Sequence, residues 1–61
     1  MPAWLVPAYQ GELTAEQLLG RYCTWVYSKV GSYEKTAQQL KLDRRTVKAK
    51  IDEGLLAEFK E

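Results

Sequence analysis

Apolar residues recur at the three- and four-residue spacing of amphipathic helices along most of this 61-residue chain. The longest such run predicts a helix over residues 14–30, begun by a capping box of Thr14 and Gln17. Gly20 and Thr24 fall on its polar side. The apolar side is wider than two short helices can cover, so we expect it to pair with a second copy of the chain. The residues expected at this dimer interface are Leu18, Leu19, Tyr22, Trp25 and Val26.

Two shorter helices are predicted over residues 32–54, joined by a tight turn. Ser32 and Asp43 stand where capping residues begin a helix, and Gly54 stands where a glycine ends one. The apolar stripes are Tyr33, Ala37 and Leu40 in the first helix and Val47, Ile51 and Leu55 in the second. Small domains use two short helices joined in this way to place one of them in the major groove of DNA. We expect residues 44–53 to be that helix.

The charges of the chain are strongly segregated, although its formal net charge is only +1. Residues 1–34 carry a net charge of −1, residues 35–50 carry +5, and residues 51–61 carry −3. Cations concentrated on one element favour contact with nucleic acid even where the whole chain is nearly neutral. The side chains expected to contact DNA are Ser32, Tyr33, Lys35, Asp43, Arg44, Arg45, Thr46, Lys48, Ala49 and Lys50.

Different roles are expected for these side chains. Arg44, in the first turn of the second short helix, can bind guanine through two hydrogen bonds, whereas Lys48 and Lys50 are expected on phosphates. Asp43 is most simply the cap of that helix, although a carboxylate there can also accept a hydrogen bond from cytosine. Ser32 begins the preceding helix, where free backbone amides can meet a phosphate.

Residues 32–51 resemble the helix-turn-helix of the Fis family, which also stands at the C-terminus of bacterial enhancer-binding activators. The most specific similarity is the run Asp43-Arg44-Arg45-Thr46-Val47. Two positions depart from the family pattern. Lys41 replaces a glycine in the turn, and Thr36 replaces an alanine with a residue whose hydroxyl can bond back to its own helix.

The resemblance implies an all-α fold, a three-helix unit with a C-terminal helix-turn-helix, that dimerises as Fis does. It also implies the function: sequence-specific binding of double-stranded DNA by the homodimeric DNA-binding domain of a bacterial transcriptional regulator. Two interpretations stay open, a domain that follows others in a longer protein and a free-standing small protein. Such a regulator works in the cytoplasm, on the nucleoid. A different interpretation of the same residues is a small helical interaction module whose basic helix meets an acidic protein.

Residues 1–13 are predicted to lie outside the helical domain, which spans residues 14–61. Pro2 and Pro7 argue against a helix there. Two interpretations remain open: an extended arm that lays Trp4, Leu5 and Tyr9 over the dimer helices, or a linker. Residues 55–61 are expected either to extend the last helix or to form a short acidic turn, with Leu55 and Phe59 in the core.

The absence of certain residue types and segments narrows the function. No apolar run in the sequence approaches the roughly 20 residues of a membrane span. Cys23 is the only cysteine and there is no histidine, so we expect no disulfide within the chain, no zinc site and no Ser-His or Cys-His nucleophile pair. We therefore expect no enzyme activity, no cofactor and no metal.

Overall fold

The computed structural model describes residues 1–59, which form helices and no strand. The elements are the 3-10 helix η1 (Ala3–Leu5) and the α-helices α1 (Val6–Tyr9), α2 (Ala15–Val30), α3 (Tyr33–Leu40), α4 (Arg44–Lys50) and α5 (Glu53–Phe59). The all-α prediction is confirmed for these residues. The chain has more helices than the expected three, because short helices stand at both ends.

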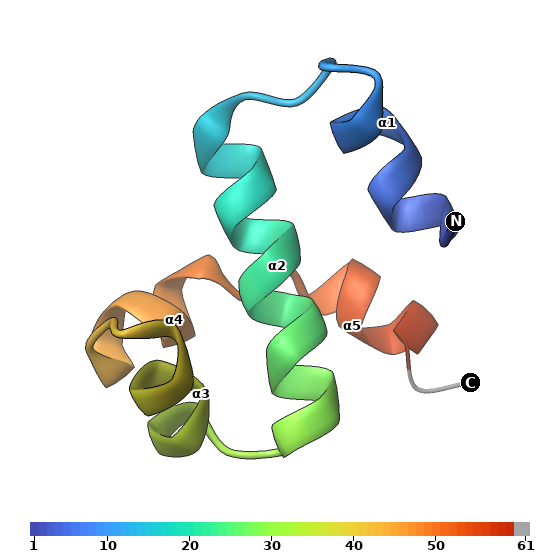
Figure 1. Cartoon of the computed structure of the whole chain (residues 1–61). Helices are drawn as coiled ribbons and strands as arrows, with labels where there is room; N and C mark the ends of the chain where they lie inside the picture. The colour runs from blue at the N-terminus through green and yellow to red at the C-terminus, as the bar shows by residue number, and fades with distance from the viewer. Residues whose placement is uncertain (60–61) are drawn as a thin grey trace.

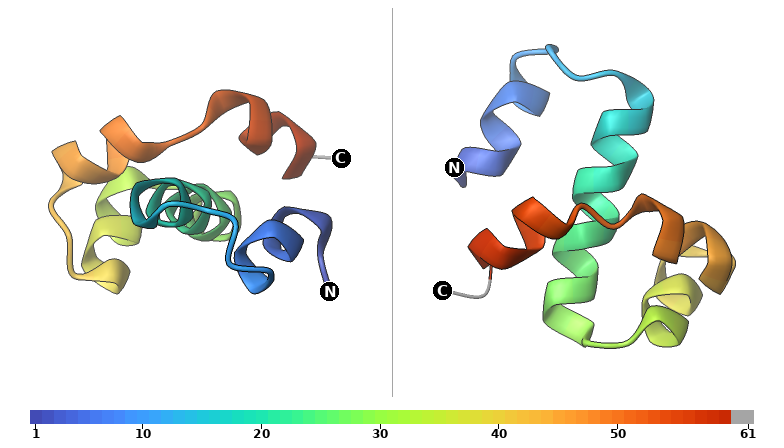
Figure 2. Two further views of the ribbon diagram at one scale, coloured as in Figure 1. Left: turned by 90° about the horizontal axis from the view of Figure 1, so that it is seen from above. Right: turned by 180° about the vertical axis from the view of Figure 1, so that it is seen from behind.

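Helix α2 is the central element, and the other helices lie on two sides of it (Figure 1). Helices α3 and α4 pack together on one side, while α5 and the N-terminal segment lie on the other. The two further views in Figure 2 show the same division. No helix of residues 1–59 has both the length and the apolar character needed to cross a membrane.

Helix α2 begins and ends as the sequence predicts. The Thr14 hydroxyl accepts a hydrogen bond from the Gln17 backbone amide at 3.0 Å, and the Gln17 side chain accepts one from the Thr14 amide at 2.9 Å. The helix ends at Gly31, whose φ of 80° is readily adopted only by glycine. The capping box and the bounds of this helix are therefore confirmed.

The expectation of an extended N-terminal segment was wrong. Residues 3–9 are helical, and Pro7 fits because it stands in the first turn of α1, where a helix needs no backbone N–H from it. Trp4 packs on Trp25, with ring centroids 5.5 Å apart, and its carbonyl oxygen accepts a hydrogen bond from Arg21 at 3.1 Å. Trp4 therefore covers α2, whereas Tyr9 is 79% exposed and does not.

The predicted helix over residues 44–53 was also wrong at its C-terminal end. Helix α4 ends at Lys50, because Ile51 has extended backbone angles of −65° and 129°. Asp52 then begins α5, where its carboxylate accepts a hydrogen bond from the Leu55 amide at 3.1 Å. Gly54 consequently lies inside α5 rather than after a helix. The prediction of a helix extension or an acidic turn over residues 55–61 includes residues 60–61, which lie outside the described part of the chain.

A buried polar contact joins α2 to the connection between α4 and α5. The Thr24 hydroxyl donates to the Gly20 carbonyl oxygen at 2.7 Å and accepts from the Asp52 amide at 2.9 Å. Gly20 is also needed for close approach, since a Cβ there would lie 3.2 Å from the carbonyl oxygen of Lys50. The residues assigned to the polar side of α2 thus hold α4 and α5 in place.

Candidate nucleic-acid interface

Local hydrogen bonds fix the turn between α3 and α4. The Leu42 amide donates to the Ala37 carbonyl oxygen at 2.9 Å, which closes the end of α3. Lys41 takes the left-handed conformation, with φ 61° and ψ 38°, at the position where the Fis pattern has glycine. A residue with a side chain strains the backbone there by about 1 kcal/mol. The next residues begin α4.

Each of the two short helices begins at the capping residue that the sequence predicts. The Ser32 hydroxyl accepts from the Lys35 amide at 3.2 Å, and the Asp43 carboxylate accepts from the Thr46 amide at 2.7 Å. The hydrogen bond from Thr46 holds the pKa of Asp43 below its ordinary value. Asp43 therefore caps α4, with its Oδ1 atom hydrogen-bonded to a backbone amide of the helix.

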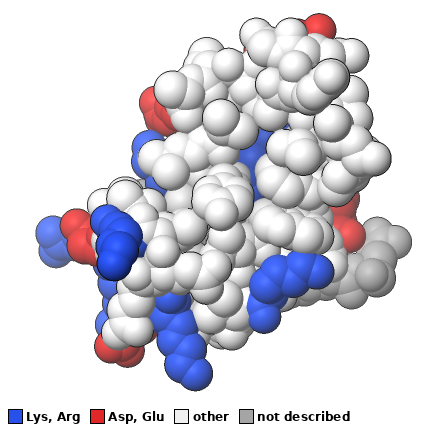
Figure 3. Space-filling model, in the orientation of Figure 1, with Lys and Arg blue, Asp and Glu red and all other residues white. Residues whose placement is uncertain are grey.

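Helix α4 presents one buried and one exposed side. Val47 is fully buried, and Ala37, on α3, is also buried. The exposed residues of α4 are Arg44, Arg45, Lys48 and Ala49, and Lys35 is exposed on α3. We call these five residues the basic surface. In Figure 3 several Lys and Arg side chains gather at the end of the molecule that α3 and α4 form. Lys41, absent from the predicted set, is exposed in the turn beside them.

Lys50 does not belong to the basic surface. Its Nζ atom lies 3.7 Å from Oε1 of Glu16, at the start of α2, and the lysine is only partly exposed. Burial raises the pKa of the Cys23 thiol, and the positive charge of Lys50 opposes that effect. Lys50 thus lies at the edge of α4 that turns towards α2, and its expected contact with a phosphate stays a prediction.

The start of α3 lies beside the first residue of α4. Ser32, Tyr33 and Arg44 line the same cleft of about 340 Å³. The ring of Tyr33 stacks on that of Tyr27, with centroids 4.6 Å apart. Desolvation raises the pKa of Tyr33, and Tyr27 and Glu53 add to the effect. The structure thus brings together three of the predicted DNA-binding residues on one flank of α4.

The predicted dimer residues divide into two groups. Leu18 and Tyr22 are 43% and 48% exposed. With Leu19 and three further residues, Trp4, Leu5 and Ala15, they line an apolar groove of about 390 Å³. Val26 is only 5% exposed, so its assignment to the dimer surface was wrong: it belongs to the core of its own chain.

Trp25 is covered largely by aromatic neighbours in the same chain. Its ring lies 5.5 Å from that of Trp4 and 5.0 Å from that of Phe59, centroid to centroid. Nζ of Lys29 lies 4.3 Å from the centre of the ring. The aromatic cluster of Trp4, Trp25 and Phe59 therefore covers, within one chain, apolar surface that the sequence pattern assigns to a dimer interface.

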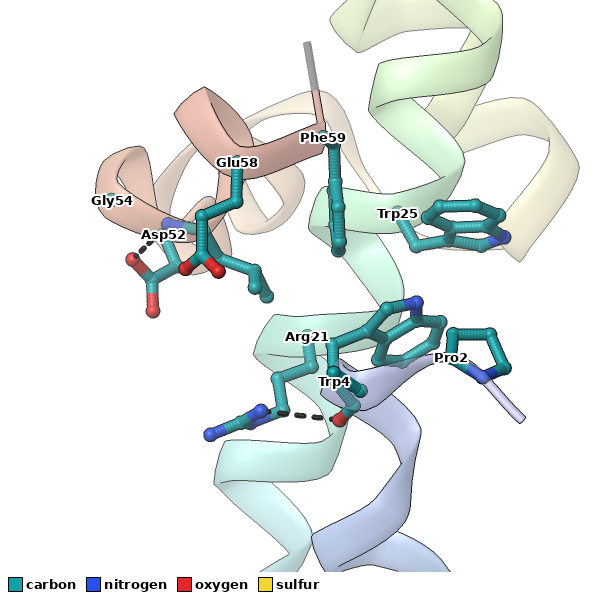
Figure 4. Close-up of a pocket in the computed structure, with 10 residues that line it drawn as sticks. Pro2, Trp4, Arg21, Trp25, Asp52, Gly54, Glu58 and Phe59 are labelled. Atoms are coloured by element: carbon teal, nitrogen blue, oxygen red, sulfur yellow. Dashed lines mark hydrogen bonds between the residues drawn. The ribbon is translucent and has the colours of Figure 1, made fainter. Parts of the chain in front are cut away.

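A cleft of about 670 Å³ lies between the N-terminal segment, α2 and α5 (Figure 4). The aromatic cluster forms one part of its lining, and Arg21, Asp52 and Glu58 form another. Arg21 is already bonded to the backbone of Trp4. Within residues 1–59, no group of three or more His, Cys, Asp or Glu side chains is placed to hold a metal ion.

No family model matches the chain, and no curated protein or solved structure matches it significantly. The interpretation of the basic surface therefore depends on its own geometry and charge.

Proposed function

We propose that this chain binds double-stranded DNA in a sequence-specific manner, with α3 and α4 as a helix-turn-helix of the Fis type. One observation carries the proposal: α4 is anchored by the buried Val47 and exposes three cations, Arg44, Arg45 and Lys48. An α-helix is about 10–12 Å across with its side chains, which matches the width of a major groove of about 12 Å.

The electrostatics of the basic surface favour a phosphate-rich partner. The acidic residue nearest to the cations along the chain, Asp43, is engaged as a helix cap. Cations at the first turn of a helix are unfavourable against the helix dipole. Arg44 and Arg45 stand there, and an external anion offsets this cost.

A homodimer is the second part of the proposal. The exposed Leu18 and Tyr22 are one turn apart on α2, and they border an apolar groove. Burying this surface against a second copy would add to the small core that 61 residues can form. A symmetric pair would place two copies of α4 on a roughly palindromic site, as in a bacterial transcriptional regulator.

Selection of bound duplexes from a random DNA pool tests the binding function, and sedimentation equilibrium tests the dimer. We expect one preferred sequence with two-fold symmetry and a mass twice that of the chain. Steep salt dependence alone is not sufficient, because an acidic protein partner would produce it as well. Recovery of no preferred sequence would favour the interaction module with an acidic protein partner instead.

A further inference from the structure

The direction in which Val47 points identifies the residues of α4 that lie deepest in a groove. Val47 is fully buried, so it marks the inward direction of the helix. Successive residues of an α-helix are rotated by about 100°. Arg45 and Ala49, two positions before and after Val47, therefore point about 160° away from it on either side. These two residues face outward most directly, and both are exposed.

The remaining polar residues of α4 lie on its flanks: Thr46 and Lys48, next to Val47, are rotated about 100° from the inward direction. Arg44 and Lys50, three positions from Val47, are each rotated about 60° from the inward direction. Their contacts agree with this placement: Arg44 lines the cleft beside Ser32 and Tyr33, and Lys50 lies 3.7 Å from Glu16 of α2. The two flanks of the helix thus face α3 and α2, and its outermost ridge consists of Arg45 and Ala49.

We propose that Arg45 and Ala49 read the base sequence, while Arg44 contacts the DNA backbone. This inference rests on the proposed function and reassigns the guanine contact that the Fis-like pattern places at Arg44. The cap uses Oδ1 of Asp43, and Asp43 precedes the helix rather than lying on its outer ridge. Within α4, Arg45 and Ala49 point most directly towards the floor of the groove.

The chemistry of these two side chains specifies what each half-site contains. An arginine forms two hydrogen bonds with O6 and N7 of guanine, and the methyl group of an alanine packs on the methyl group of thymine. Four residues along a helix span about 6 Å, and base pairs are stacked about 3.4 Å apart. Each half-site therefore contains a guanine and a thymine about two base pairs apart.

Sequence selection with matched variants tests this assignment. The wild-type chain should select the guanine and the thymine. Arg45→Ala should lose the guanine preference at one position per half-site, by roughly 5- to 100-fold. Arg44→Ala, which also removes one exposed cation from α4, should weaken binding to all duplexes alike and leave the preferred sequence unchanged. Equal melting temperatures of the two variants would show that folding does not cause the difference.

Two further arms address Ala49. Replacing the thymine of the selected site by uracil removes one methyl group, which should weaken binding by the wild-type chain roughly threefold to fourfold. Ala49→Gln should instead select adenine at that position, because glutamine forms two hydrogen bonds with adenine.

Each possible outcome has a definite meaning. If Arg44→Ala rather than Arg45→Ala removes the guanine preference, the assignment of base reading to the outermost ridge is wrong, although DNA binding stands. An unchanged selection by Ala49→Gln would likewise exclude Ala49 from the base contacts. If the wild-type chain selects no sequence, the proposed function fails and this inference fails with it.

Discussion

The two sides of α2 are built from different interactions. On the side of α3 and α4, contact depends on small residues and on one buried polar group: Gly20 and Ala37 allow close approach, and Thr24 binds the Asp52 amide at 2.9 Å. On the other side, large aromatic rings fill the space between α2, α5 and the N-terminal segment, with centroids 5.0–5.8 Å apart.

This difference concerns orientation as much as stability. A hydrogen bond and a close backbone contact tolerate little displacement, so they fix the rotation of α4 and hence the direction of Arg45. Aromatic rings provide a large apolar area with less strict geometry. We infer that the polar side determines how the basic surface is presented, whereas the aromatic side supplies much of the free energy of folding.

The largest change in the free energy of unfolding is expected when a ring of the aromatic cluster is removed. Trp25→Ala removes the ring that contacts both Trp4 and Phe59. We expect unfolding to become easier by about 3 kcal/mol, at the low end for tryptophan because Trp25 is partly exposed. Chemical denaturation followed by circular dichroism measures this change. Tyr9→Ala is the control, since Tyr9 is 79% exposed and its loss should have almost no effect. Equal effects of the two variants would contradict the claim that the aromatic cluster stabilises the fold.

The second prediction compares two buried threonines whose hydroxyls differ in partners. Thr24 accepts from the Asp52 amide, whereas Oγ1 of Thr36 has no hydrogen-bond partner among the described residues. Thr24→Val should therefore destabilise the fold by about 2 kcal/mol, because the Asp52 amide would lose its acceptor. Thr36→Val should stabilise it by about 1 kcal/mol, because a buried hydroxyl without a partner is removed.

Thermal unfolding of both valine variants tests this opposite sign. Thr24→Ser keeps the hydroxyl and serves as the control for the first change. Two changes of the same sign would show that shape, rather than hydrogen bonding, decides the effect. The result also bears on Thr36, because the helix bond that the sequence suggests for its hydroxyl does not form.

A smaller effect is expected from the two helical glycines. Alanine in place of glycine in a helix ordinarily stabilises it by about 1 kcal/mol. Gly54→Ala should show most of this gain, since its new Cβ would meet the Asp52 side chain at an ordinary 3.5 Å. Gly20→Ala should lose the gain or become destabilising, because its Cβ would meet the Lys50 carbonyl oxygen at 3.2 Å. A similar gain from both, measured by denaturation, would show that α4 can move away from α2 without cost.

The sequence predicted best those features that depend on neighbouring residues. The caps at Thr14, Ser32 and Asp43 and the helix end at Gly31 are all local, and the structure has each of them. The break after Lys50 was missed because Ile51 continues the apolar spacing of α4, while the Asp52 amide that stops the helix bonds to Thr24, distant in sequence.

The errors at the candidate interface have the same origin. The sequence placed the cations on α4 correctly, but spacing alone does not show that Lys50 meets Glu16. The prediction for the N-terminal segment failed because a proline disrupts the interior of a helix but not its first turn, where Pro7 stands in α1. The packing of this segment on Trp25 in turn reduces the apolar band that suggested a dimer, so the prediction of dimerisation now depends mainly on Leu18 and Tyr22.

The smallest expected effect concerns pH and the cap of α4. Hydrogen bonding from Thr46 lowers the pKa of Asp43 in the folded chain. A carboxyl group with a lowered pKa stabilises the fold fully above its unfolded value of about 4, and this contribution is lost as pH falls through the folded pKa. Asp43→Asn keeps an oxygen acceptor but does not titrate. Melting temperatures measured from pH 6 down to pH 2 should therefore fall slightly less for Asp43→Asn than for the wild-type chain. Identical pH profiles would mean that ionisation of the Asp43 carboxyl does not contribute to the acid sensitivity of the fold.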